Sequence, residues 1–148
     1  GIALDAAGAV CRFERWQGPW DMTKQRIRAA TGRVDALVDS TGVGDPVLED
    51  LQKAGGGNFT GFKFSAISKQ QLMEGLAVDI QQRATAFPAG VIVTELESFE
   101  YAYTRTGVRY GAPQGSHDDC VCALALAREH YRRQWRPGRG YDVQALVM

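Results

Sequence analysis

The sequence lacks several features that would place it in a specialised class of protein. Cysteines are few, three among 148 residues, and an odd count with Cys120 and Cys122 in one segment does not make a disulfide framework. No run approaches the roughly 18 apolar residues of a membrane-spanning helix, and no start resembles a signal peptide. Charge of neither sign is in excess, since 17 Lys and Arg balance 17 Asp and Glu. These absences favour a soluble, cytoplasmic protein with reduced thiols.

What remains is the composition of an ordinary globular domain. Hydrophobic residues make up 45% of the chain and charged residues 23%, which is normal usage for a folded protein. A length of 148 residues suits one domain with a buried core. We therefore predict a single domain over 1–135 and, after the loop-forming segment "RPGRG", a loose C-terminal tail over 136–148.

The order of predicted elements indicates an α/β domain that opens with an antiparallel hairpin. Segments 1–4 and 9–16 alternate like two strands around a turn at Asp5 and Gly8. Caps and apolar spacing then predict helices over 20–32 and 46–54, strands over 34–39, 60–66 and 90–93, helices that begin at Ser68 and Thr94, an edge strand after Gly107, and a last helix over 116–135. A hairpin, a helix, a buried strand and a final helix that opens with carboxylates match a ribonuclease H-like plan.

Asp39 stands at the end of a strand, "VDALVD", that is apolar on both faces. The working crevice of an open α/β sheet lies beyond the carboxyl ends of its strands. The glycine-containing loop over 40–44 lets backbone come close to a ligand there. Two interpretations stay open: Asp39 contributes to a site, or it only caps the turn, because the loop is not a full dinucleotide-binding fingerprint.

Asp118 and Asp119 are two adjacent carboxylates at the start of an apolar helix. One acid at this position is common, because the helix dipole favours negative charge there, and that role alone is the plain alternative for both. If Asp39 converges with this pair, the repelling carboxylates need cations. Oxygen ligands select hard ions such as Mg²⁺ or Mn²⁺. Two such ions about 4 Å apart can activate water for phosphodiester hydrolysis.

Two neighbouring side chains are auxiliary candidates for the same site. His117 is a further ligand, a proton shuttle or a hydrogen-bonding residue of the loop. Lys69, near the start of a helix, contacts a nucleic acid or is simply solvated. The stretch "REHYRRQWRPGRGY" is the one basic concentration of the chain and either binds phosphate or forms a solvated helix end.

Four segments together resemble the C-terminal nuclease domain of bacteriophage terminase large subunits: "VDSTGVGDPVLEDL", "SKQQLMEGLAVDIQ", "TELESFEY" and "YGAPQGSHDDCVCALALA". The similarity in order and spacing covers roughly residues 34–130. It implies a ribonuclease H-like fold and an endonuclease that cuts concatemeric double-stranded viral DNA with two Mg²⁺ or Mn²⁺ ions. The acidic positions of the family fall on Asp39, Asp118 and Asp119. The implied partners are the terminase ATPase domain of the full-length protein, the portal and the small terminase subunit, in the host cell cytoplasm.

The chain departs from that family at its front. The family carries its first catalytic aspartate on a strand that precedes the segment "GIAL", and Asp5 in the hairpin turn does not match that position. The motor's phosphate-binding loop is also missing. We therefore expect an incomplete nuclease domain that lacks the first strand and cuts poorly by itself. The open side of "VDALVD" should pair with an upstream strand, a strand of another copy, or the "GIAL" hairpin.

Two alternatives to the nuclease remain from the residues alone. One is a nucleotide-binding domain of the actin-like or sugar-kinase type, which also uses an aspartate before a glycine loop. The other is a non-catalytic module that holds DNA or docks to a portal. Nucleotide binding without metal-dependent nicking would favour the first, and DNA binding that ignores mutation of the acids would favour the second.

Overall fold

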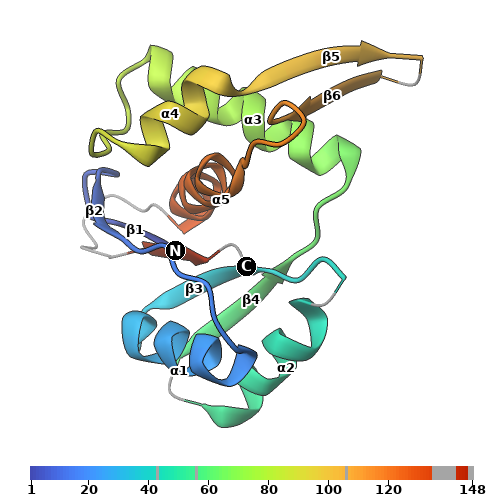
Figure 1. Ribbon diagram of the computed structural model, residues 1–148. Helices are drawn as coiled ribbons and strands as arrows, with labels where there is room; N and C mark the ends of the chain where they lie inside the picture. The colour runs from blue at the N-terminus through green and yellow to red at the C-terminus, as the bar shows by residue number, and fades with distance from the viewer. Residues whose placement is uncertain (43, 56, 106, 135–142, 147–148) are drawn as a thin grey trace.

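The computed structural model describes residues 1–148 except 43, 56, 106, 135–142 and 147–148. A five-stranded sheet in the order β2–β1–β7–β3–β4 forms the centre of the domain (Figure 1). Its strands are β1 (Ile2–Leu4), β2 (Val10–Phe13), β3 (Asp35–Asp39), β4 (Asn58–Phe62) and β7 (Val143–Leu146). None of the helices in the described ranges is long and apolar enough to cross a membrane.

Helices cover both faces of this sheet (Figure 1). On one face lie α1 (Trp20–Thr31) and α2 (Gly44–Ala54). On the other lie α3 (Ala66–Gln81), α4 (Val91–Ser98) and α5 (Asp119–Gln134). A separate two-stranded ribbon of β5 (Glu100–Thr104) and β6 (Gly107–Gly111) projects beyond α3 and α4.

The strand β3 is buried on both faces, as its sequence predicts. Alternate side chains of a strand point to opposite faces. Ala36 and Val38 pack into the cluster that α1 and α2 form, whereas Leu37 packs into the cluster around α5. Both described neighbours of β3, β4 and β7, run parallel to it. The carboxyl end of β3, with Asp39, therefore opens at one edge of the sheet.

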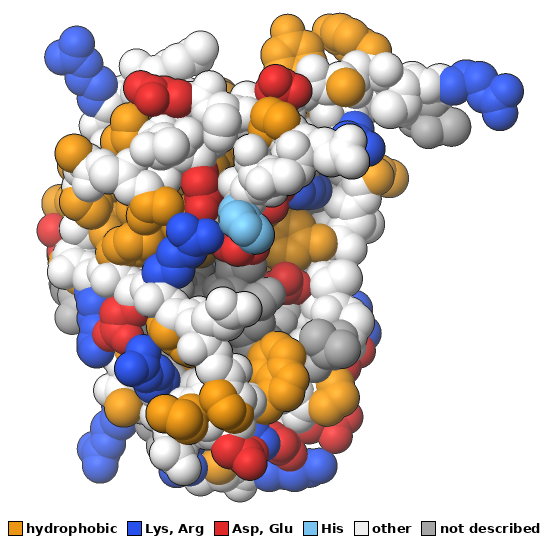
Figure 2. All heavy atoms as spheres, in the orientation of Figure 1, with side chains coloured by type: hydrophobic (Ala, Val, Ile, Leu, Met, Phe, Trp, Pro, Cys, Tyr) orange, Lys and Arg blue, Asp and Glu red, His pale blue; other side chains and the backbone are white. Residues whose placement is uncertain are grey.

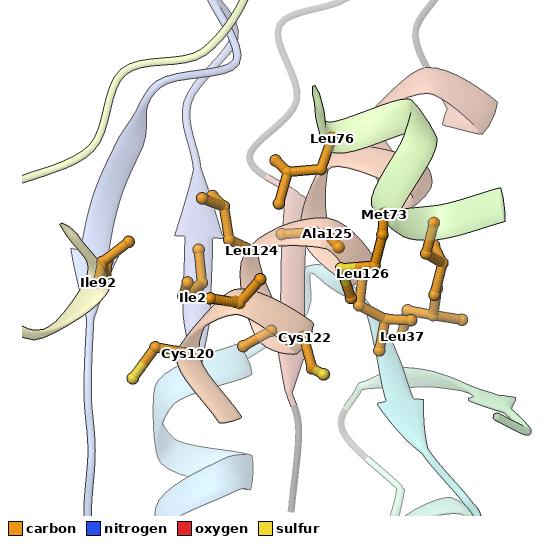
Figure 3. Close-up of a cluster of buried hydrophobic side chains, with 14 of the residues drawn as sticks. Ile2, Leu37, Met73, Leu76, Ile92, Cys120, Cys122, Leu124, Ala125 and Leu126 are labelled. Atoms are coloured by element: carbon orange, nitrogen blue, oxygen red, sulfur yellow. The ribbon is translucent and has the colours of Figure 1, made fainter. Parts of the chain in front are cut away.

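The helix α5 is buried along most of its length, because small residues let it approach the sheet and α3 closely. Its buried run extends from Cys120 to Arg128. Figure 3 shows its side chains between Ile92 of α4, Ile2 of β1 and the pair Met73 and Leu76 of α3. Both cysteines of the helix are core residues, and burial raises the pKa of each thiol to about 12.

The strand β7 corrects the predicted C-terminal tail. Val143–Leu146 lies between β1 and β3, with Ala145 opposite Ile2 on one side and Leu37 on the other. The neighbour of β3 thus comes from the same chain, and it is none of the three that we expected. The physical reason is that the buried backbone N–H and C=O groups of a central strand need hydrogen-bond partners, and β7 supplies them to β3. The rest of 136–148 lies outside the described residues.

Further elements differ from the sequence-based expectation. The strand predicted over 60–66 is β4, Asn58–Phe62, and the helix predicted to begin at Ser68 begins at Ala66 with Ser65 as its cap. The last helix begins at Asp119 instead of Ser116, because Ser116 belongs to a turn in which its N–H donates to Pro113 O. The segment 90–93, predicted as a strand, mostly forms the first turn of α4. The helix predicted from Thr94 ends at Ser98, and Tyr103 beyond it lies in β5 with 82% of its surface exposed.

Candidate active site between β3 and α5

Asp39 is the last residue of β3, and its carboxylate is held by the turn that follows. Oδ1 accepts a hydrogen bond from the N–H of Thr41 at 2.9 Å. The hydroxyl of Thr41 in turn accepts one from the N–H of Phe64 at 2.8 Å, which ties the loops after β3 and β4 together. Asp39 can therefore cap the turn and still take part in a site. Only its Oδ1 is used by the turn, and no described residue donates a hydrogen bond to its Oδ2.

Asp118 lies directly before α5 and pairs with Lys69 of α3. The distance between Lys69 Nζ and Asp118 Oδ2 is 2.7 Å, and about a quarter of each side chain is exposed, 26% and 25%. Strand β6 ends beside the same carboxylate, because a Cβ added to Gly111 would lie 3.7 Å from Asp118 Oδ2. Lys69, an auxiliary candidate from the sequence, is thus a direct partner of a predicted site residue.

Asp119 is the first residue of α5 and faces a different neighbourhood. With Arg15, Trp16 and Trp20 it lines a cavity of about 300 Å³. Its side chain is 61% exposed, and Nδ1 of His117 lies 3.9 Å from its Oδ2. The role of His117 as a ligand, a proton shuttle or a hydrogen-bonding residue of the loop stays a prediction.

The charges around the start of α5 act on one common group, the thiol of Cys122. Burial raises the pKa of this thiol to about 12, the charge of Lys69 lowers it, and the charges of Asp118, Asp119 and Asp39 raise it further. Each of these four charges therefore lies near enough to the start of α5 to act on the buried thiol. Figure 2 shows a histidine beside acidic and basic side chains near the middle of the corresponding face.

The carboxylate oxygens of Asp39, Asp118 and Asp119 are suitable ligands for a hard cation, but the described residues do not bring them together into a complete metal site. Carboxylate oxygens are the ligands that Mg²⁺ and Mn²⁺ prefer. The ammonium of Lys69 on Asp118 shows that this position accommodates a positive charge. In the described part of the chain, however, no three His, Cys, Asp or Glu side chains are grouped closely enough to hold one ion. A site built from all three aspartates stays a prediction.

Glu95 is a residue near the site that sequence reasoning missed. It is buried in α4, and its Oε2 accepts a hydrogen bond from the N–H of Cys120 at 2.7 Å. A carboxylate thus caps the first turn of α5, where orphan N–H groups favour an anion. The available signal was its position three residues after Ile92, on the buried side of an apolar helix.

The basic stretch late in α5 is used inside the protein. Arg128 is buried and donates to Asp79 Oδ2 at 2.9 Å and to Gly8 O at 3.1 Å. Arg132 contacts Asp79 as well, and Arg133 pairs with Glu129 at 2.7 Å. Each of these three arginines therefore has an acid of this chain as its partner. Arg136 and Arg139 lie outside the described residues.

Comparison with known proteins identifies relatives over most of the chain. The large terminase subunit of Thermus virus P23-45 is 35% identical over 137 residues, which is 88% of this chain, while the chain spans 28% of the length of that relative. The solved large terminase nuclease from the thermophilic phage G20c with bound cobalt has a TM-score of 0.79 and 32% identity, covering 86% of this chain and 72% of the solved one. The same nuclease with bound magnesium has a TM-score of 0.75 and 32% identity, covering 83% and 68%.

No protein-family model matches the chain. The solved neighbours nevertheless confirm the ribonuclease H-like α/β fold that the sequence predicts, and they confirm the resemblance on which the nuclease interpretation depended. At 32% identity over more than two thirds of both chains, the relationship is one of sequence as well as of fold. The chain belongs to the family of phage large terminase nuclease domains.

Proposed function

We propose that the chain is the metal-dependent endonuclease part of a DNA-packaging terminase and cuts concatemeric double-stranded DNA. The single observation that carries this proposal is the similarity of the chain to a large terminase nuclease that binds divalent metal, and the position of Asp39 at the end of β3 and the ion pair of Asp118 with Lys69 support it. The G20c relative, which carries magnesium in its solved form, supports Mg²⁺ or Mn²⁺ as the cofactor. The comparisons favour this function over the nucleotide-binding alternative.

Asp39 and Asp118, with Asp119 as the third ligand, would hold the cations. When bound, such ions lower the pKa of a water and stabilise the leaving oxygen of a phosphodiester. The chain's own contribution is orientation: Thr41 fixes the carboxylate of Asp39 and Glu95 fixes the first turn of α5. Lys69 keeps Asp118 neutralised in the absence of metal, and His117 would lie at the rim of the site.

The partners follow from the packaging context and belong to the proposal. Double-stranded DNA is the substrate, and the ATPase domain of the full-length protein would supply it. The portal and the small terminase subunit are the expected binding partners of the whole terminase, which would act in the cytoplasm of the host cell.

Metal binding and nicking by residues 1–148 test this function together. Mn²⁺ should raise the melting temperature, and plasmid DNA should be nicked in Mn²⁺ or Mg²⁺ but not in chelator. The melting shift is the more direct readout, because it reports metal binding without requiring cleavage. Asp39→Asn and Asp118→Asn should each remove both effects. If Mn²⁺ neither stabilises the protein nor supports nicking, or if both variants behave like the wild type, the proposal is wrong.

A further inference from the structure

The ribbon of β5 and β6 projects from the domain and pairs with no other described strand (Figure 1). Every residue of β5 is exposed. A two-stranded ribbon buries too little apolar surface to be stable by itself. Its support comes from its base, where β6 contacts α3.

The two faces of the ribbon differ in chemistry, and their register shows which residues share a face. Tyr101 lies opposite Tyr110, and Tyr103 follows on the same side. The ring of Tyr101 lies 5.8 Å from that of Tyr103 and 6.2 Å from that of Tyr110. Since Tyr110 packs against the buried core, this tyrosine face is the inner face at the base of the ribbon.

The other face looks toward the candidate site. It carries Arg109 opposite Ala102, and Gly111 opposite Glu100. A Cβ at Gly111 would lie 3.7 Å from Asp118 Oδ2, so this face passes directly beside the carboxylate. Side chains two residues apart in a strand point to the same face, so Arg109 points to the same side as Asp118. Its Cα lies about 7 Å along the strand from that of Gly111. The face thus has acids at its base and a cation further out.

Arg109 is available for an external partner. It is exposed, and within the described ranges no carboxylate pairs with it, nor with Arg105 at the tip of the ribbon. By contrast, the arginines late in α5 are all paired with acids of this chain. Figure 2 shows a basic side chain at the outer end of the projecting ribbon.

We propose that the Arg109 face of the ribbon binds the phosphate backbone of duplex DNA beside the bond that is cut at Asp118. The proposal rests on the proposed nuclease function for the identity of that bond. Each DNA strand carries a phosphate about every 3.4 Å of helix axis, so Arg109 meets a phosphate within about two nucleotides of the cleaved one. A guanidinium suits this role because its planar donors match phosphate oxygens.

Binding without metal tests the proposal independently of cleavage. We would measure fluorescence anisotropy of a labelled duplex in chelator over a range of salt concentrations. Arg109→Ala should lower the slope of log K against log salt by about 0.9, which corresponds to about eightfold weaker binding near 0.1 M salt. Arg109→Lys keeps the charge and should retain most of the affinity. Arg33→Ala removes the same charge from an exposed position before β3, at the opposite end of the strand from Asp39, and should leave the binding of that duplex unchanged.

A second variant tests which face of the ribbon is used. Tyr103→Ser changes the tyrosine face at an exposed position and should bind DNA like the wild type. Melting curves should be unchanged for all variants at these exposed sites. The proposal is overturned if Arg109→Ala binds like Arg33→Ala, if Tyr103→Ser loses affinity as much as Arg109→Ala, or if the wild type does not bind the duplex. Arg109-dependent binding by a protein that never nicks would leave this surface intact and overturn only the proposed function.

Discussion

Lys69 Nζ and Asp118 Oδ2 lie 2.7 Å apart and join the first turn of α3 to the residue before α5. The pair is separated by 49 positions in the chain. The ammonium group of Lys69 occupies a position at Asp118 where the proposed function needs a metal ion. Lys69 and the metal ion would therefore compete for the carboxylate of Asp118.

Lys69→Met should therefore bind Mn²⁺ more tightly while lowering the stability of the metal-free protein. The loss should be at most about 1 kcal/mol, because the pair is partly solvated. Melting curves with and without Mn²⁺ give both quantities. Lys53→Met is the matched control, since it breaks an exposed pair with Glu49 far from the site. Equal behaviour of the two variants would contradict the competition.

Glu95→Ala should destabilise the domain by about 1–3 kcal/mol, because the buried N–H of Cys120 loses its acceptor. Urea unfolding followed by circular dichroism measures the change. Glu97→Ala removes an exposed acid from the same helix and should have little effect. The capping role fails if both substitutions lower the free energy of unfolding equally.

His130 should make the domain less stable in acid. Burial lowers the pKa of His130 from its ordinary 6.5, with the charge and backbone of Asp35 opposing in part. A base with a lowered folded-state pKa binds its proton more readily when unfolded, so its contribution is intact above about pH 6.5 and is lost as pH falls through the lowered pKa. His130→Leu should flatten this part of the stability–pH curve. Parallel curves for the two proteins would assign the dependence to other groups.

Ala145→Pro should unfold the main sheet or cost at least about 3 kcal/mol, because proline removes a backbone donor from a strand with neighbours on both sides. Ala145 faces Ile2 and Leu37 in those neighbours. Ala102→Pro in the outlying ribbon is the control and should leave the main melting transition in place. A cooperative melt of Ala145→Pro at the wild-type temperature would show that β7 is dispensable.

The predictable part of the fold is the part in which local pattern and tertiary environment agree. Leu37 and its neighbours are apolar without interruption, and the strand is buried on both faces. Asp39 ends β3, as the apolar pattern of that strand predicts. That its carboxylate and the carboxylate of Asp118 form one site stays a prediction. Tyr103 is an aromatic residue of the kind that often packs in a core, but it lies in the exposed ribbon of β5 and β6. Its local sequence does not distinguish a buried position from an exposed one.

Partners distant in sequence were beyond local reasoning. The four residues of β7 follow a segment rich in proline and glycine and are too few to show a period, so their strand exists only because β1 and β3 leave a place for it. The pairing of Lys69 with Asp118, and of Glu95 with the start of α5, likewise depends on how α3 and α4 dock onto α5. Charge and spacing identified these residues as polar but not as each other's neighbours.

The antiparallel pairing of β7 with β1 makes the domain a candidate for circular permutation. Ile2 lies opposite Ala145 and Leu4 opposite Val143, so these strands are related like the two arms of a hairpin whose turn is absent. A short engineered turn from β7 into β1 would convert a contact between distant segments into a local one, and new ends could open in the loop between α2 and β4. Since every strand pairing is retained, such a permutant should keep the same sheet, while the pairing of β3 with β4 becomes the one between segments distant in sequence.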